Sequence, residues 1–249
     1  MRALSLSSLV LLAAALPAAA QTLHQPEFRL SNFHAPLRID NWLSPMQRGT
    51  RTVFHELEDG ECSVNDVVVP GSVKRDFQGD YAGLSARPVL DKVWADPQCD
   101  GTRGVLLEDT IDWYAQDDGG NVWYVGEHTV EYFFDDAGHR TGSSSEGSWE
   151  AGRDGARAGI VMLAKPVPGL YYRQEYLRGV AEDAARVEKV GIRVSTPLGY
   201  FTDCIKTRET TAITPDDLEY KYYCPNIGLV RVLSPTVHGG AELVDFGLH

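Results

Sequence analysis

Two neighbouring segments in the middle of the chain, residues 105–116 and 122–134, combine carboxylates with large aromatic side chains. Aromatic walls with a few polar groups are typical of sites that bind small apolar molecules. Two carboxyl groups held at a suitable separation can also act as acid and base in sugar hydrolysis. Six residues of these segments are the candidate ligand-binding residues: Asp112, Trp113, Tyr114, Trp123, Tyr124 and Glu127.

The short sequence DDGGN between the two segments is rich in residues that tolerate positive φ, and it predicts a β-hairpin. Strict alternation places Asp112 and Tyr114 on one face of the first strand and Trp113 on the other. On the second strand it places Tyr124 on the face opposite Glu127. Neither face is plainly polar, so the aromatic residues either line a cleft or serve as core and cross-strand packing.

No motif in the chain assigns a catalytic residue. Further carboxylates at Glu108, Asp109 and Glu131 could pair across the hairpin, which keeps a hydrolase open as an alternative. The chain has no Gly-x-Ser-x-Gly elbow, no His pair at metalloprotease spacing and no glycine-rich nucleotide loop. The DDGGN turn lacks the ligand spacing of a calcium loop. We therefore expect no metal and no cofactor.

The N-terminus predicts export. Arg2, an apolar run over residues 4–16 and three alanines at 18–20 form a signal peptide, residues 1–20, with cleavage after Ala20. The expected location is the periplasm or the medium. In such an oxidising compartment the four cysteines predict two disulfides. Of the three possible connectivities we favour pairing within each local segment: Cys62–Cys99 and Cys204–Cys224.

Charge and composition narrow the possible partners. The 249-residue chain has a formal net charge of −12, which disfavours nucleic acid and anionic membranes as partners. No apolar run reaches the length of a membrane span. The expected partner is an apolar ligand or another envelope protein, and the oligomeric state is open.

The rest of the chain predicts a mainly β fold. Residues 21–45 form an extended lead-in, and residues 21–249 form one domain of short strands separated by turns. Residues 179–189 could form a short helix or continue into a strand. We expect a single antiparallel sheet or a partly open half-barrel or barrel, with one or two short helices.

Two passages resemble a group of uncharacterised exported bacterial proteins, many of them lipoproteins. One is DWYAQDDGGNVWYVGE at residues 112–127, which continues with GSWEAG at residues 147–152. The other is TPLGYF at 196–201, followed by KYYCPNIGLV at 221–230. The second pattern also looks like one found in β-rich envelope proteins similar in shape to periplasmic lipoprotein carriers with a half-barrel sheet. The resemblance implies an exported β-sheet protein and supplies no catalytic residue. The chain departs from the lipoprotein members because it has no lipobox cysteine.

Three functional hypotheses follow. The first is a non-catalytic envelope protein that binds an apolar or amphipathic ligand, or a partner protein, through an aromatic-lined sheet face. The second is an extracytoplasmic hydrolase that uses a carboxylate pair. The third is a purely structural or interaction module, which would present an exposed apolar patch or sheet edge.

Overall fold

The computed structural model describes residues 23–248, and the predicted signal peptide, residues 1–20, lies outside the described residues. Helical structure in the described part of the chain is limited to three short 3-10 turns: η1 (Leu30–Asn32), η2 (Gly79–Tyr81) and η3 (Pro235–Val237). All other regular structure there is antiparallel β-sheet.

Most strands belong to two groups, which we name the N-terminal wall and the C-terminal wall. The N-terminal wall contains β1 (Thr50–Glu58), β2 (Glu61–Val68), β3 (Arg87–Ala95), β4 (Leu106–Gln116) and β5 (Val122–Phe134). The C-terminal wall contains β11 (Asp183–Thr196), β12 (Gly199–Thr211), β13 (Glu219–Cys224), β14 (Gly228–Ser234) and β15 (Gly239–Leu248). Five shorter strands lie between them in sequence: β6 (Arg140–Ser144), β7 (Trp149–Glu150), β8 (Arg157–Met162), β9 (Tyr171–Arg173) and β10 (Glu175–Tyr176).

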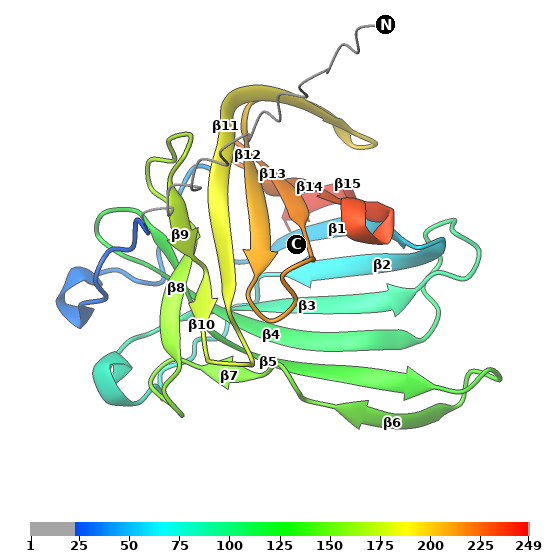
Figure 1. The fold of residues 1–249 in the computed structure, drawn as a ribbon, viewed down its shortest axis with the longest axis horizontal. Coiled ribbons are helices and arrows are strands. Elements are labelled where there is room, and N and C mark those ends of the chain that lie inside the picture. The colour runs from blue at the N-terminus through cyan, green and yellow to red at the C-terminus, as the bar shows by residue number, and fades with distance from the viewer. Residues whose placement is uncertain (1–22, 249) are drawn as a thin grey trace, which may run out of the picture.

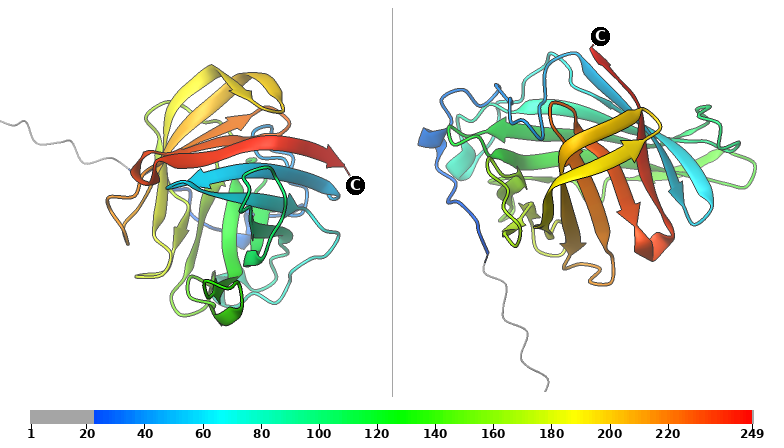
Figure 2. Two further views of the ribbon diagram at one scale, coloured as in Figure 1. Left: turned by 90° about the vertical axis from the view of Figure 1, so that its right-hand side faces the viewer. Right: turned by 90° about the horizontal axis from the view of Figure 1, so that it is seen from above.

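The two walls form one continuous, curled sheet. Its strand order is β10-β8-β5-β4-β3-β2-β1-β15-β14-β13-β12-β11-β9, with β6 and β7 both paired to β5. The first and last long strands of the walls, β1 and β15, are hydrogen-bonded neighbours, and they lie side by side in Figure 2. In Figure 1 the upright strands of the C-terminal wall stand in front of the N-terminal wall. The sheet is nearly closed and barrel-like, which confirms the predicted fold class.

Residues 179–189 adopt the strand alternative, since β11 begins at Asp183. Ala184, Ala185 and Val187 are buried there, between the pairing strands β9 and β12. A helix of that length is marginal without tertiary packing, whereas the small alanines fit the crowded strand.

Both predicted disulfides are present. Cys62–Cys99 ties the start of β2 to the loop after β3, with a Cα–Cα distance of 5.3 Å. Cys204–Cys224 ties β12 to the end of β13, with a Cα–Cα distance of 4.2 Å. Each joins segments of one wall, so each stabilises its wall by limiting the unfolded chain.

The end of the lead-in closes one end of the barrel. Residues 39–46, which we name the capping segment, place Leu43 (0% exposed) and Ile39 in a core with residues of β5, β8, β12 and β13. The segment is hydrogen-bonded to both walls: the Asn41 side chain donates to Gly120 O, and the Asn226 backbone N–H donates to Trp42 O. The space enclosed by the walls, which we name the interior, is therefore capped at this end.

Candidate functional site

A bulge in the central hairpin decides which candidate residues face the interior. In the β4–β5 ladder Asp112 pairs with Glu127, but Tyr114 pairs with Tyr124, so that Val125 is the extra residue on β5. A bulge of one residue reverses the alternation of every side chain beyond it. Tyr124 and Glu127 therefore share a face, and the prediction that they lie on opposite faces was wrong.

Gly126 makes this bulge possible. Its φ is +139°, and a Cβ at this position would lie 2.5 Å from the Trp149 backbone oxygen on β7. Only glycine allows β7 to approach β5 so closely. Trp149 then lies directly opposite Glu127 in the short β5–β7 ladder.

The six candidate residues divide into two sets. Asp112, Tyr114, Tyr124 and Glu127 share the inner face of the hairpin. Trp113 and Trp123 lie on the outer face. Trp113 packs against Phe77 and under the Lys74 ammonium, and Trp123 packs edge-on against Phe28 and Phe33. The outer tryptophans thus bind loop and lead-in segments onto the sheet.

The inner set is a connected polar and aromatic group. The Tyr124 hydroxyl donates a hydrogen bond to Asp112 Oδ1 at 2.5 Å, and the Tyr124 ring stacks on Tyr114 with centroids 4.9 Å apart. Trp149 contacts Tyr124 edge-on. These contacts fix the orientation of the Asp112 carboxyl group, which is buried.

A cavity of about 290 Å³ lies directly beneath the capping segment. Its apolar lining comes from both walls and includes Phe54, Val67, Val89 and Leu229. Its charged lining consists of Asp91, Asp112 and Lys221. Asp91 accepts a hydrogen bond from the Asn65 amide at 2.8 Å. This cavity can hold a small ligand that is apolar along one side and polar at one end.

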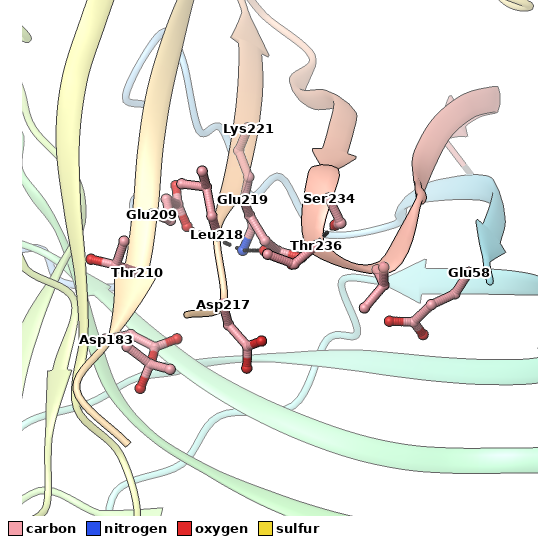
Figure 3. Close-up of a pocket in the computed structure, with 12 residues that line it drawn as sticks. Glu58, Asp183, Glu209, Thr210, Asp217, Leu218, Glu219, Lys221, Ser234 and Thr236 are labelled. Carbon is pink, nitrogen blue, oxygen red and sulfur yellow. Dashed lines mark hydrogen bonds and ion pairs between the residues drawn. The ribbon is translucent and has the colours of Figure 1, made fainter. Parts of the chain in front are cut away.

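The opposite end of the interior is open and acidic. Figure 3 shows Lys221 reaching between Glu209 and Glu219, with Asp183 and Asp217 nearby and Glu58 across the opening. The Lys221 Nζ lies 3.1 Å from Glu209 and 3.2 Å from Glu219. Because Lys221 also lines the capped cavity and a third hollow beside Glu56, all three hollows meet at this side chain.

Carboxyl groups greatly outnumber cations along these hollows. Lys221 is the only lysine or arginine among their lining residues within the described chain. Eight carboxylic residues line them: Glu56, Glu58, Asp91, Asp112, Asp183, Glu209, Asp217 and Glu219. Two of the eight, Glu209 and Glu219, already share Lys221, so the others have no cationic partner in the interior.

Burial, and to a smaller extent repulsion between the carboxyl groups, shifts the proton affinities of several of these residues. Burial, reinforced by the charge of Glu127, raises the pKa of Asp112 to about 7. Burial raises the pKa of Glu127 to about 7 as well, and it raises the pKa values of Glu56 and Asp91. The ammonium of Lys221 lowers the pKa of Glu219. Near neutral pH the capped cavity therefore holds protons that a bound cation could replace.

One buried hydroxyl group at the edge of the interior lacks a hydrogen-bond partner among the described residues. Tyr172 is 0% exposed, its hydroxyl is unpaired, and in the ladders it is separated from Glu209 only by Ala185. An unpaired hydroxyl group at such depth is uncommon.

Most of these interior residues were missed by the sequence analysis. Glu209, Glu219 and Lys221 lie on strands of the C-terminal wall, far from the central hairpin in sequence, and Asp91 lies on β3, which pairs with the hairpin strand β4. A signal for them does exist: Glu219, Lys221 and Tyr223 alternate on one strand with residues of the other face. When charged residues occupy alternate positions of a strand whose other face packs in the core, they indicate that the first face lines a polar interior.

The two disulfides indicate that the protein folds in an oxidising, extracytoplasmic compartment. None of the helical turns in residues 23–248 has the length and apolar character to cross a membrane. Within the same residues, no three His, Cys, Asp or Glu side chains are grouped as metal ligands.

Comparisons with known proteins give no family. No protein-family model matches the chain, and no curated protein matches it. Among solved structures it is similar to one from Parabacteroides distasonis described as a "putative lipoprotein", with 13% identity and a TM-score of 0.40. That similarity covers 83% of this chain and 99% of the other.

Proposed function

We propose that the protein is an exported binding protein that holds a small amphipathic cation in its interior. The apolar part of the ligand lies beneath the capping segment, and its positive group lies beside Asp91 and Asp112. The single observation that carries the proposal is the composition of the hollows, where one lysine faces eight carboxylic residues. A cation there is attracted by several carboxylates in a low-dielectric space.

The chemistry of the capped cavity favours an organic cation over a purely apolar ligand. A fully apolar molecule would keep the buried Asp91 and Asp112 carboxyl groups protonated and would offer them no polar contact, which costs free energy. An anion would meet the carboxylates directly. An alkylammonium ion satisfies both parts of the lining, because its chain contacts Phe54 and Leu229 while its N–H groups donate to the carboxylates.

Export is the second part of the proposal. The signal-peptide pattern of residues 1–20 and the two disulfides support a location in the periplasm or the medium after cleavage behind Ala20. The motif resemblance to exported β-rich proteins supports the same location.

A hydrolase is less well supported by this geometry. Asp112 and Glu127 are opposed across the hairpin, but burial brings the pKa of each to about 7. A general acid and a nucleophile or base need pKa values that are pushed apart. Glu127 also does not line the capped cavity that Asp112 lines.

The test is calorimetric titration of the chain without residues 1–20 with n-octylamine, octanol and octanoate, which share one alkyl chain and differ in charge. We expect saturable binding of octylamine, weaker binding of octanol and none of octanoate. Asp112→Asn should weaken octylamine binding by about tenfold, the effect of one charge-assisted hydrogen bond. Asp109→Asn is the matched control, because Asp109 lies on the outer face of β4 and pairs with Lys92. Equal binding of all three compounds, or tightest binding of octanoate, would overturn the proposal.

A further inference from the structure

A second pocket lies on the outer side of the capping segment, separate from the acidic interior. It encloses about 490 Å³ and shares only Pro45 and Met46 with the capped cavity. Three of its lining residues are arginines: Arg38, Arg48 and Arg87. We name it the arginine pocket. The chain as a whole has a net charge of −12, so three arginines around one pocket give this part of the surface a positive charge that contrasts with the rest.

The pocket has little negative charge of its own. Its only carboxylate is Asp40, which already pairs with Arg38 at 2.8 Å and accepts a hydrogen bond from the Gln116 amide. Arg48 and Arg87 have no carboxylate within ion-pair distance among residues 23–248. The pocket therefore carries an uncompensated positive charge.

Arg87 is held with part of its guanidinium unused. It extends from β3, where its Nη2 donates to Leu37 O at 2.8 Å, and its Nε is buried without a partner. Burial, and then the nearby charge of Arg48, lowers the pKa of Arg87. The positive charges of Arg48 and Arg87, which line the same pocket, repel each other, and an anion bound by both would remove that repulsion.

An aromatic surface lies beside these arginines. Trp42 is 43% exposed although it is a large apolar side chain, and it lines the pocket with Met46. The Asn226 side chain adds a further polar group at the rim, and the Asn226 backbone N–H fixes the position of Trp42. The pocket thus combines guanidinium forks for an oxyanion with an indole face for an apolar or planar group.

We propose that the arginine pocket binds an organic phosphate, with the phosphate between Arg48 and Arg87 and the organic part against Trp42. Phosphate fits because its several oxygens can accept from two guanidinium groups at once and its charge removes their repulsion. Such a group can come from a soluble phosphate ester or from a lipid headgroup. This site is independent of the interior cation site proposed above.

The test uses two probes on the chain without residues 1–20, phenyl phosphate and phosphatidylglycerol vesicles, with pure phosphatidylcholine vesicles as the blank. Calorimetry measures phenyl phosphate binding, and co-sedimentation measures vesicle binding. We expect saturable binding of phenyl phosphate that is tighter than binding of inorganic phosphate, because Trp42 adds a contact. Trp42→Phe should change the tryptophan fluorescence response without abolishing binding.

The charge variants decide the assignment. Arg48→Gln and Arg87→Gln should each weaken binding by about tenfold, whereas Arg193→Gln, an exposed arginine on β11, should have no effect. Arg48 is exposed, so its variant should fold even where an Arg87 variant does not. Binding of phenyl phosphate identifies a soluble ester as the source, and binding of phosphatidylglycerol vesicles alone identifies a headgroup. Binding of neither probe, or equal binding by wild type and Arg48→Gln, would overturn the proposal.

Discussion

The two ends of the interior are built from the same sheet, but they differ in how their buried carboxyl groups are neutralised. At the capped end, residues 39–46 cover an apolar lining, and Asp91 and Asp112 are enclosed without a cation of their own. At the open end, Glu209 and Glu219 share Lys221 near solvent. Buried charge is stable only when it is neutralised. At the open end Lys221 offsets part of the negative charge of Glu209 and Glu219, whereas at the capped end Asp91 and Asp112 rely on protons or on a bound cation.

The largest effect should come from removing the cover of the capped end. Leu43→Ala deletes a fully buried side chain and should lower the free energy of unfolding by about 2–5 kcal/mol. Leu57→Ala at the open end removes a side chain that is 45% exposed and should cost less than about 1 kcal/mol. Urea denaturation of both variants measures the difference. Equal losses would show that the capping segment is not part of the folded core.

The next effect concerns the ammonium that the two ends share. Lys221→Met should destabilise the protein by roughly 2–3 kcal/mol near neutral pH, because Glu209 and Glu219 lose their counter-charge. Lys221 lowers the pKa of Glu219, and a lowered carboxyl pKa contributes stability that disappears as the pH falls. The loss should therefore shrink near pH 4. Lys189→Met, at an exposed position of β11, is the control and should change little. A loss that is independent of pH would contradict this role.

The smallest expected effect is a gain in stability at the capped end. The pKa of Asp112 is raised to about 7, so the folded state keeps a proton that the unfolded chain loses near pH 4. Stability from this group is therefore highest in acid and falls as the pH rises towards 7. Asp112→Asn cannot ionise and should be more stable than wild type by about 1–2 kcal/mol near pH 8. Thermal unfolding across this pH range checks the sign, and a variant that is less stable near pH 8 would refute it.

Local features of the fold could be predicted from the sequence, and long-range ones could not. The hairpin around DDGGN and the two disulfides depend on residues close in the chain. Which residues lie on the inner face of that hairpin depends on the bulge at Val125, and the only local sequence signal of this bulge is Gly126. Strict alternation therefore placed Tyr124 away from Glu127.

The acidic interior depends on the order of strands in the sheet. Lys221 comes close to Asp91 and Asp112, which lie on the paired strands β3 and β4, only because β1 pairs with β15 and the two walls face each other. Nothing in the spacing of these residues indicates that pairing. The division of the aromatic residues has the same cause: Trp113 and Trp123 pack against Phe77, Phe28 and other residues of distant segments on the outer face.

The most direct test of the account is the number of protons released when the interior binds n-octylamine near pH 6. Calorimetry in buffers of different ionisation enthalpy gives this number. If a cation replaces the protons on Asp112 and its neighbours, binding should release about one proton or more, and Asp112→Asn should release fewer. Binding without proton release would show that the carboxyl groups of the capped end do not receive the cation, and it would contradict the central claim.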